Sequence, residues 1–112
     1  MLRGMQRTLR PGRRVRGSTR GRPIMALLDL LGRRWSLRVI WELHRQPLGF
    51  RELQAACGGI SPTILNTRLR ELRAAAVVTL GDAGYALTSE GERLLAELDG
   101  LHAWAERWAK RA

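Results

Sequence analysis

The chain has 112 residues, 45% of them hydrophobic, and its 20 Lys and Arg residues against 10 Asp and Glu residues give a formal net charge of +10. This length suits one domain and excludes a two-domain dehydrogenase, a kinase or a barrel enzyme. The single cysteine, Cys57, excludes an internal disulfide framework. No apolar run reaches the roughly 18 residues that span a bilayer. We therefore expect a basic cytoplasmic protein without a membrane partner.

The basic charge is concentrated at one end of the chain. Eight of the 19 arginines lie in residues 1–22, which contain no acidic residue and show no helical or strand periodicity. This composition predicts a disordered basic arm over 1–22 and a folded domain over 23–112. Such an arm can bind the backbone of DNA or RNA, or it can be a solvated tail that keeps the protein soluble.

Two helices are expected at the start of the folded domain. The first ends near Gly32, and helical spacing predicts that one face of it is formed by Ile24, Leu27, Leu28, Leu31 and Trp35. The second covers about 36–44, with a turn after it at a Gln-Pro-Leu-Gly sequence. We expect both Trp35 and Trp41 to lie in the core, since they belong to apolar helical stretches.

The next segment contains a helix, a tight turn and another helix. The first of these helices is expected over 50–57, with Cys57 as a small buried hydrophobe. Two glycines then allow a tight turn, and Ser61 followed by Pro62 is typical of a capped helix start. The second helix, over 61–73, is predicted to bury Ile64, Leu65, Leu69 and Leu72.

A hairpin and a long helix complete the domain. Strand periodicity over 77–80 and 85–88, on either side of a Gly-Asp-Ala-Gly turn, predicts a short β-hairpin. A C-terminal helix of about 89–110 follows. Its apolar stripe is too long to be buried within the single folded domain of residues 23–112. We expect this stripe to form a dimer interface, although its tryptophans could instead line a small-molecule pocket; its residues are Leu94, Leu98, Leu101, Trp104, Ala105 and Trp108.

Two short helices joined by a glycine-containing turn predict a helix-turn-helix, whose second helix enters the DNA major groove. The fold class is therefore mainly α with a small β-hairpin as a wing. Short polar and basic side chains on the second helix suit base edges and phosphates. The expected DNA-binding residues are Arg51, Ser61, Pro62, Thr63, Asn66, Thr67 and Arg70. Arg51 could instead form a surface ion pair, and Arg68 and Arg73 could be solvated or paired residues of the helix.

Residues 23–95 resemble the HxlR-type winged helix-turn-helix transcriptional regulators of bacteria. The stretches that carry the resemblance are Pro23-Ile24, Leu31-Gly32-Arg33-Arg34-Trp35, Phe50-Arg51-Glu52-Leu53, Gly59-Ile60-Ser61, Arg68-Leu69-Arg70-Glu71-Leu72 and Tyr85-Ala86-Leu87-Thr88 with Gly91. The resemblance implies a homodimer, with the terminal helices among the dimerising elements, on a pseudo-palindromic DNA operator. Members of this family differ in whether they repress or activate transcription.

The chain departs from the family pattern at two places. Many members have a cysteine directly before the proline of the first motif, here Pro23, where this chain has Arg22, so a thiol switch at that position is not expected. The wing is short, with Asp82 at its tip and no Lys or Arg between Ala74 and Arg93. Wing contacts with phosphates are therefore not expected, and one hypothesis is that the arm of residues 1–22 supplies them.

No pattern in the chain indicates an enzyme, a cofactor site or a metal site. The catalytic and nucleotide-binding motifs are missing, and His44 and His102 lack the spacing of metal ligands. The leading interpretation is a homodimeric, sequence-specific DNA-binding regulator at the nucleoid, with any small-molecule effector unknown. One alternative is an RNA- or ribosome-associated protein that binds through its arginine arm. Another is a protein-interaction adaptor, because winged helices also pair without nucleic acid.

Overall fold

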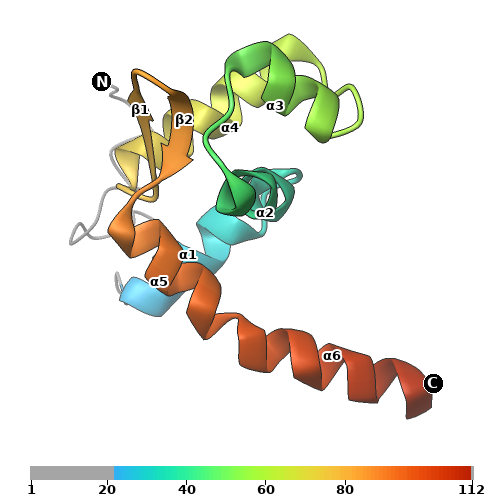
Figure 1. The fold of residues 1–112 in the computed structure, drawn as a ribbon. Coiled ribbons are helices and arrows are strands. Elements are labelled where there is room, and N and C mark those ends of the chain that lie inside the picture. Colours follow the sequence, from blue (N-terminus) through green and yellow to red (C-terminus); the bar gives the residue numbers. More distant parts are fainter. Residues whose placement is uncertain (1–21, 112) are drawn as a thin grey trace.

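The computed structural model describes residues 22–111 as a helical domain with one antiparallel hairpin (Figure 1). The mainly α fold class with a small hairpin is therefore confirmed. The arm expected over 1–22 lies outside the described residues, apart from Arg22. The elements are α1 (Pro23–Leu31), α2 (Ser36–Arg45), α3 (Phe50–Ala56), α4 (Pro62–Ala74), β1 (Val78–Gly81), β2 (Gly84–Leu87), α5 (Ser89–Glu97) and α6 (Asp99–Arg111).

The core lies where α2, α3, α4 and the hairpin meet. Each of these elements contributes buried apolar side chains, so no helix is stable without its neighbours. Cys57 is among them, as predicted for a small buried hydrophobe. The buried residues that form the core are Leu30, Val39, Ile40, Leu43, Leu53, Cys57, Ile60, Leu65, Leu69, Leu72, Val77 and Val78.

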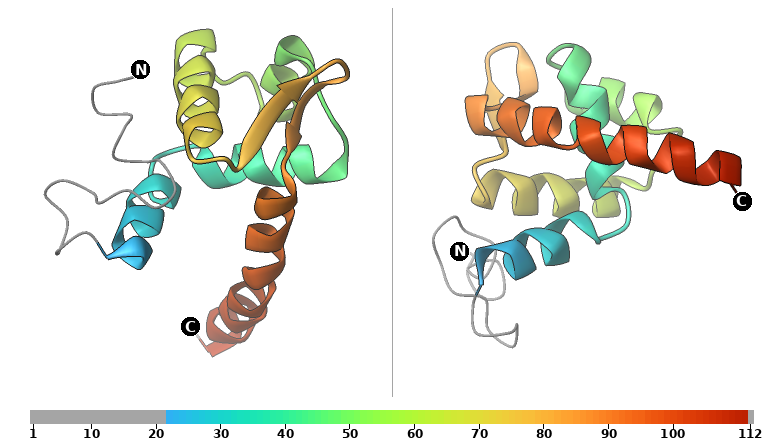
Figure 2. Two further views of the ribbon diagram at one scale, coloured as in Figure 1. Left: turned by 90° about the vertical axis from the view of Figure 1, so that its left-hand side faces the viewer. Right: turned by 90° about the horizontal axis from the view of Figure 1, so that it is seen from below.

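The hairpin is joined to the helical layer by a third segment of backbone. β1 and β2 pair antiparallel from Val78 with Leu87 to Gly81 with Gly84. Leu48, in the loop between α2 and α3, exchanges two backbone hydrogen bonds with Tyr85 at 2.8 and 2.9 Å. This bridge fixes the hairpin beside α2, and its tip extends from the same end of the molecule as α3 and α4 (Figures 1 and 2).

Several residues expected in the core lie at the surface. Trp41 is 55% exposed because α2 buries the face that contains Ser36, Val39, Ile40 and Leu43, and Trp41 lies on another face. Ile64, expected in the buried stripe of α4, is 39% exposed. Ile24 and Leu28 of α1 are exposed, and the residue that α1 buries is Leu30. Trp35 lies beyond the end of α1 and packs partly against the core.

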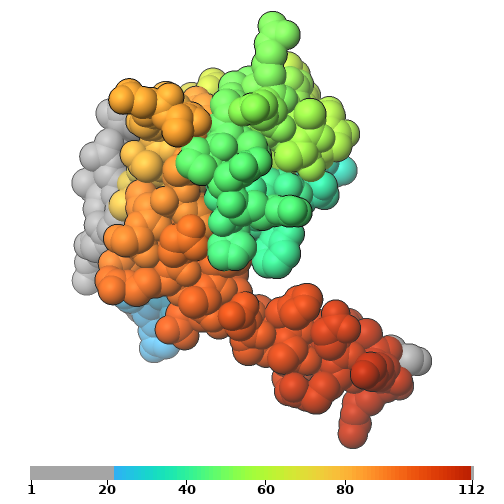
Figure 3. All heavy atoms as spheres, in the orientation of Figure 1, coloured from blue at the N-terminus to red at the C-terminus, as the bar shows by residue number. Residues whose placement is uncertain are grey.

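The long C-terminal helix expected over about 89–110 is two helices, with a break at Leu98 between α5 and α6. The side chains of Leu94 and Leu95 pack against the core, so α5 belongs to the body of the domain. The α6 helix buries no residue and projects from the body as a separate arm (Figure 3). Within residues 22–111, no helix combines the length and apolar character needed to cross a membrane.

Alanine substitutions at Gly91 and Gly100 compare a tightly packed position with an open one in the C-terminal helices. A β-carbon at Gly91 would overlap the carbonyl oxygen of Val77, whereas one at Gly100 would meet no atom within 4 Å. We expect Gly91→Ala to lower the free energy of unfolding by about 1–3 kcal/mol through overpacking. Gly100→Ala should raise it by up to about 1 kcal/mol, since alanine favours a helix. Urea denaturation measures both, and equal effects would contradict the packing described here.

Candidate nucleic-acid interface

The turn between α3 and α4 is fixed by hydrogen bonds to the last turn of α3. Gly58 and Gly59 have φ angles of 78° and 87°, which glycine adopts without steric cost. Their N–H groups donate to the carbonyl oxygens of Ala55 and Gln54, each at 2.9 Å. The Gln54 side chain then donates to the carbonyl oxygen of Ile60 at 2.9 Å. The direction in which α4 leaves α3 is therefore set by three hydrogen bonds.

The start of α4 is capped as its sequence predicts. Ser61 is extended, and its hydroxyl oxygen accepts a hydrogen bond from the N–H of Ile64 at 3.1 Å. Pro62 occupies the first helical position, where no N–H is required. The buried side of α4 holds Leu65, Leu69 and Leu72. The other side of its first two turns is left to the solvent.

Most of the DNA-binding residues expected from the sequence lie on this solvent side. Thr67 is only half-exposed, and its hydroxyl donates a hydrogen bond to the carbonyl oxygen of Thr63 at 3.0 Å. The hydroxyl oxygen of Thr67 can therefore only accept a hydrogen bond from a partner. Arg51 is exposed in the first turn of α3, at the end of that helix far from the turn. The structure therefore brings together the α4 set and leaves Arg51 apart; the exposed members of that set are Ser61, Pro62, Thr63, Asn66 and Arg70.

The middle of α4 is joined to the α1–α2 turn (residues 32–35) by an ion-pair network that sequence analysis missed. Glu71 is only 7% exposed, and its two carboxylate oxygens accept from Arg33 at 2.7 Å and Arg68 at 3.1 Å. Arg68 also donates through Nε to the carbonyl oxygen of Arg34 at 2.7 Å. Arg33 makes a second pair with Asp29 at 3.1 Å. Arg68 is thus a structural residue, and the local signals of the network are the spacings of Arg68 to Glu71 and of Asp29 to Arg33.

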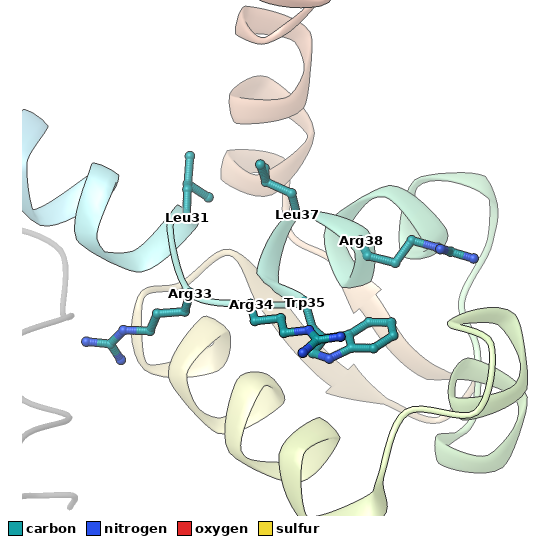
Figure 4. A pocket seen from close by; sticks show the side chains of 6 residues that line it. All are labelled: Leu31, Arg33, Arg34, Trp35, Leu37 and Arg38. Carbon is teal, nitrogen blue, oxygen red and sulfur yellow. The ribbon is translucent and has the colours of Figure 1, made fainter.

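The α1–α2 turn has an unusual backbone and lines a shallow hollow. Trp35 has a φ of 82°, a left-handed conformation that costs a bulky side chain roughly 1–2 kcal/mol. The guanidinium carbon of Arg34 lies 5.6 Å from the centre of the Trp35 ring. Leu31 and Leu37 point to the same side of the turn, away from this pair (Figure 4). The hollow is lined by Leu31, Arg33, Arg34, Trp35, Leu37 and Arg38.

The wing contributes no positive charge to this end of the molecule. Its tip, from Gly81 to Gly84, includes Asp82 and no basic residue. Three of the four residues of β1 are exposed, among them Leu80. The positive charge next to α4 therefore comes from the helices and from the α1–α2 turn.

Cys57 is not placed for chemistry with a ligand. Its side chain is 1% exposed in the core next to the α3–α4 turn. Burial raises the pKa of the Cys57 thiol, partly offset by the positive charge of Arg38. The thiol is therefore protonated at neutral pH and shielded from electrophiles. Among residues 22–111, no group of three or more His, Cys, Asp or Glu side chains could hold a metal ion.

The expected dimer stripe divides between the body of the domain and α6. Leu94 is partly buried in the body, and Leu98 at the break is half-exposed. On α6, Trp104 and Trp108 are 51% and 58% exposed and stack on each other with ring centres 5.7 Å apart. Leu101 and Ala105 lie exposed on the same helix. The α6 stripe (Leu101, Trp104, Ala105 and Trp108) is thus an apolar surface that residues 22–111 leave uncovered.

The Glu71 network is tested by comparing it with an exposed ion pair. Glu71→Gln removes a buried charge that holds two guanidinium groups, so we expect the free energy of unfolding to fall by about 1–3 kcal/mol. Glu90→Gln breaks the solvent-exposed pair with Arg93 and should change it by less than about 0.5 kcal/mol. Urea denaturation of both variants is the measurement. A Glu71→Gln effect no larger than that of Glu90→Gln would show that the network does not stabilise the fold.

Comparison with known proteins supports this geometry. The HxlR-like helix-turn-helix family matches residues 30–112. YvaP, an uncharacterized HTH-type transcriptional regulator of Bacillus subtilis, is 31% identical over 88 residues, which are 72% of this chain and 82% of YvaP. A second such regulator, from Halalkalibacterium halodurans, is 31% identical over 90 residues, covering 73% of this chain and 80% of that protein.

The structural comparison agrees with the sequence comparison. The crystal structure of quinone-bound YodB from B. subtilis matches with a TM-score of 0.71 and 32% identity, over 75% of this chain and 96% of the YodB chain. The resemblance found from the sequence motifs is thereby confirmed, as is the winged helix-turn-helix fold. The chain belongs to the HxlR-like helix-turn-helix family, a family of DNA-binding transcriptional regulators.

Proposed function

We propose that this protein is a homodimeric, sequence-specific regulator of transcription that places α4 in the major groove of its operator. The observation that carries the proposal is the exposed first half of α4. There a capped helix start presents polar and basic side chains outward, while the opposite side of the helix is locked into the core. This is the arrangement that a recognition helix requires, since base edges are read by side chains near its N-terminus.

Two side chains of α4 have the chemistry to distinguish bases. The amide of Asn66 can bond the N6 and N7 edge of adenine, and the guanidinium of Arg70 can bond O6 and N7 of guanine. Both residues are exposed, and no carboxylate among the described residues pairs with Arg70. Ser61 and Thr63, at the start of the helix, suit phosphate oxygens. Specificity is therefore assigned to Asn66 and Arg70, and orientation to the residues before them.

The homodimer is proposed from the α6 stripe. A stacked pair of half-exposed tryptophans on a helix with no buried residue is typical of a surface covered by a partner. α6 leaves the molecule at the end opposite the α3–α4 unit and the wing (Figures 1 and 2). Two copies joined through α6 would leave both recognition helices free, so the operator would have two half-sites about one helical turn apart.

Such a regulator acts on the chromosome in the bacterial cytoplasm. It acts there as a repressor or an activator of the genes next to its operator. The arginines of residues 1–22 would add general affinity for the DNA backbone, which falls as salt concentration rises. They also motivate the second candidate, an RNA- or ribosome-associated protein that binds through this arm.

DNA reading by α4 is tested with duplexes selected from a random library by the full chain. The double variant Asn66→Ala/Arg70→Ala should lose about ten-fold or more of the preference for selected over random duplex, since each base contact contributes about 1–3 kcal/mol. Arg93→Ala, which removes a charge from α5, should keep the preference. Fluorescence anisotropy measures all three proteins.

Other results of the same experiment would reject the proposal. If the wild-type chain selects no duplex and binds RNA of any sequence equally well, and if deletion of residues 1–22 alone abolishes that binding, the arm is the binding element. If the chain binds neither DNA nor RNA at low salt, the winged domain is a protein-interaction adaptor.

The dimer interface is tested by the mass of the protein in solution. Trp104→Ala/Trp108→Ala removes the apolar area that would be buried between two copies, so we expect a dimer-to-monomer shift in sedimentation equilibrium. Leu80→Ala, which shortens an exposed apolar side chain on the wing, should leave the dimer intact. A monomeric wild-type chain, or a double variant that dimerises as tightly as the wild type, would contradict an interface at α6.

A further inference from the structure

We propose that the α1–α2 turn is a second DNA-contacting surface, in which Arg34, held over the indole of Trp35, binds a phosphate of the DNA backbone beside α4. The inference rests on the proposed function and adds to it a contact that reads no bases. It assigns to this turn the backbone contact that a winged helix-turn-helix often makes through its wing.

The position of the turn along α4 fits the rim of the major groove. The Arg34 carbonyl oxygen is bonded to Arg68, which lies six residues after Pro62 at the start of α4. At 1.5 Å per residue, this places the turn about 9 Å back from the N-terminus of the helix. When α4 lies in the major groove, the turn is level with the stretch between Asn66 and Arg70, beside the phosphates that flank the groove there.

Among the described arginines at this turn, Arg34 is the one whose guanidinium group is free to bind an anion. Arg33 is bound to Glu71 and Asp29, and the nearby Arg38 is bound to Glu42 and to the carbonyl oxygen of Ala56. No carboxylate within residues 22–111 forms an ion pair with Arg34, and its side chain is exposed. In Figure 4, the guanidinium groups of Arg33 and Arg38 point away from Arg34 in opposite directions.

The turn also holds Arg34 in place before any DNA binds. The indole of Trp35 lies beneath the guanidinium, which favours a cation through its ring face and restricts the side chain. The left-handed backbone of Trp35 is maintained by the bonds from Arg33 and Arg68 to Glu71 and from Arg68 to the turn. Because this geometry exists in the free protein, a phosphate contact there requires little additional ordering.

The distribution of charge favours a contact at this turn over one at the wing. The wing tip holds Asp82, which repels phosphate, and no basic residue lies between Ala74 and Arg93. A helix in the major groove has a phosphate backbone on either side, and these contacts fix its register. With an acidic wing, the α1–α2 turn is a described segment bonded to α4 that carries an unpaired cation.

The experiment measures how the affinity of the full chain for duplex DNA depends on salt. Wild type, Arg34→Ala and Arg93→Ala are compared on the selected duplex and on a random duplex by fluorescence anisotropy. Each phosphate contact contributes about 0.9 to the slope of log affinity against log salt, so Arg34→Ala should lower the slope by about 1.8 in a homodimer. Arg93→Ala should lower it much less, and Arg34→Lys should retain most of it because lysine also binds phosphate.

The outcomes separate this inference from the proposed function. An equal loss of affinity on both duplexes, with the smaller slope, supports a backbone contact at Arg34. An Arg34→Ala slope equal to that of Arg93→Ala overturns it, as does a loss confined to the selected duplex, which would indicate base reading. Binding of the wild type tests the proposed function independently, and thermal unfolding of Arg34→Ala shows whether the exposed side chain matters to the fold.

Discussion

One buried carboxylate joins α4 to the α1–α2 turn and, together with the apolar core, sets the orientation of this helix. Glu71 accepts hydrogen bonds from Arg33, before α2, and from Arg68 on its own helix. Burying a carboxylate is costly unless each oxygen is satisfied, and here both are. The consequence is geometric as much as energetic: α4 cannot rotate about its axis without breaking the bonds that hold the α1–α2 turn. The side of α4 that faces solvent is thereby fixed.

The two surfaces of the proposed function lie at opposite ends of the molecule, and α2 packs between them. α2 packs against α3, α4 and β2 toward one end, and against α1 and α5 toward the other. The first end presents the start of α4 and the wing, and the second carries α6 (Figures 1 and 3). Because α2 is buried along one face, with Val39 and Ile40 fully enclosed, it holds these neighbouring elements together.

Features that depend on neighbours in the chain were predictable. Paired glycines, the Ser61 cap with Pro62 after it, and the strand periods of the hairpin are local patterns, and the structure contains all three. The solvent-facing side of α4 follows from the same helical period, once Leu65, Leu69 and Leu72 are assigned to the core. The exposed residues of that side are therefore where the sequence predicts them.

Features that depend on distant contacts were not predictable. Trp41 belongs to a helix that is apolar on more than one face, and only the tertiary packing decides which face is buried. Glu71 and Arg33 are 38 positions apart, so no local pattern indicates their pairing. The break at Leu98 likewise interrupts a continuous helical period. Helical periodicity reports which residues share a face, but it does not report what covers that face.

Methylation interference on a selected duplex tests major-groove reading by α4 most directly. A methyl group on guanine N7 projects into the major groove, at the atom that an arginine such as Arg70 would contact. For a homodimer with α4 in that groove, we expect interference at guanines in two half-sites about one helical turn apart, on one face of the duplex. Sequence-specific binding that tolerates methylation at every guanine N7 but is lost when minor-groove edges are modified would contradict recognition by α4.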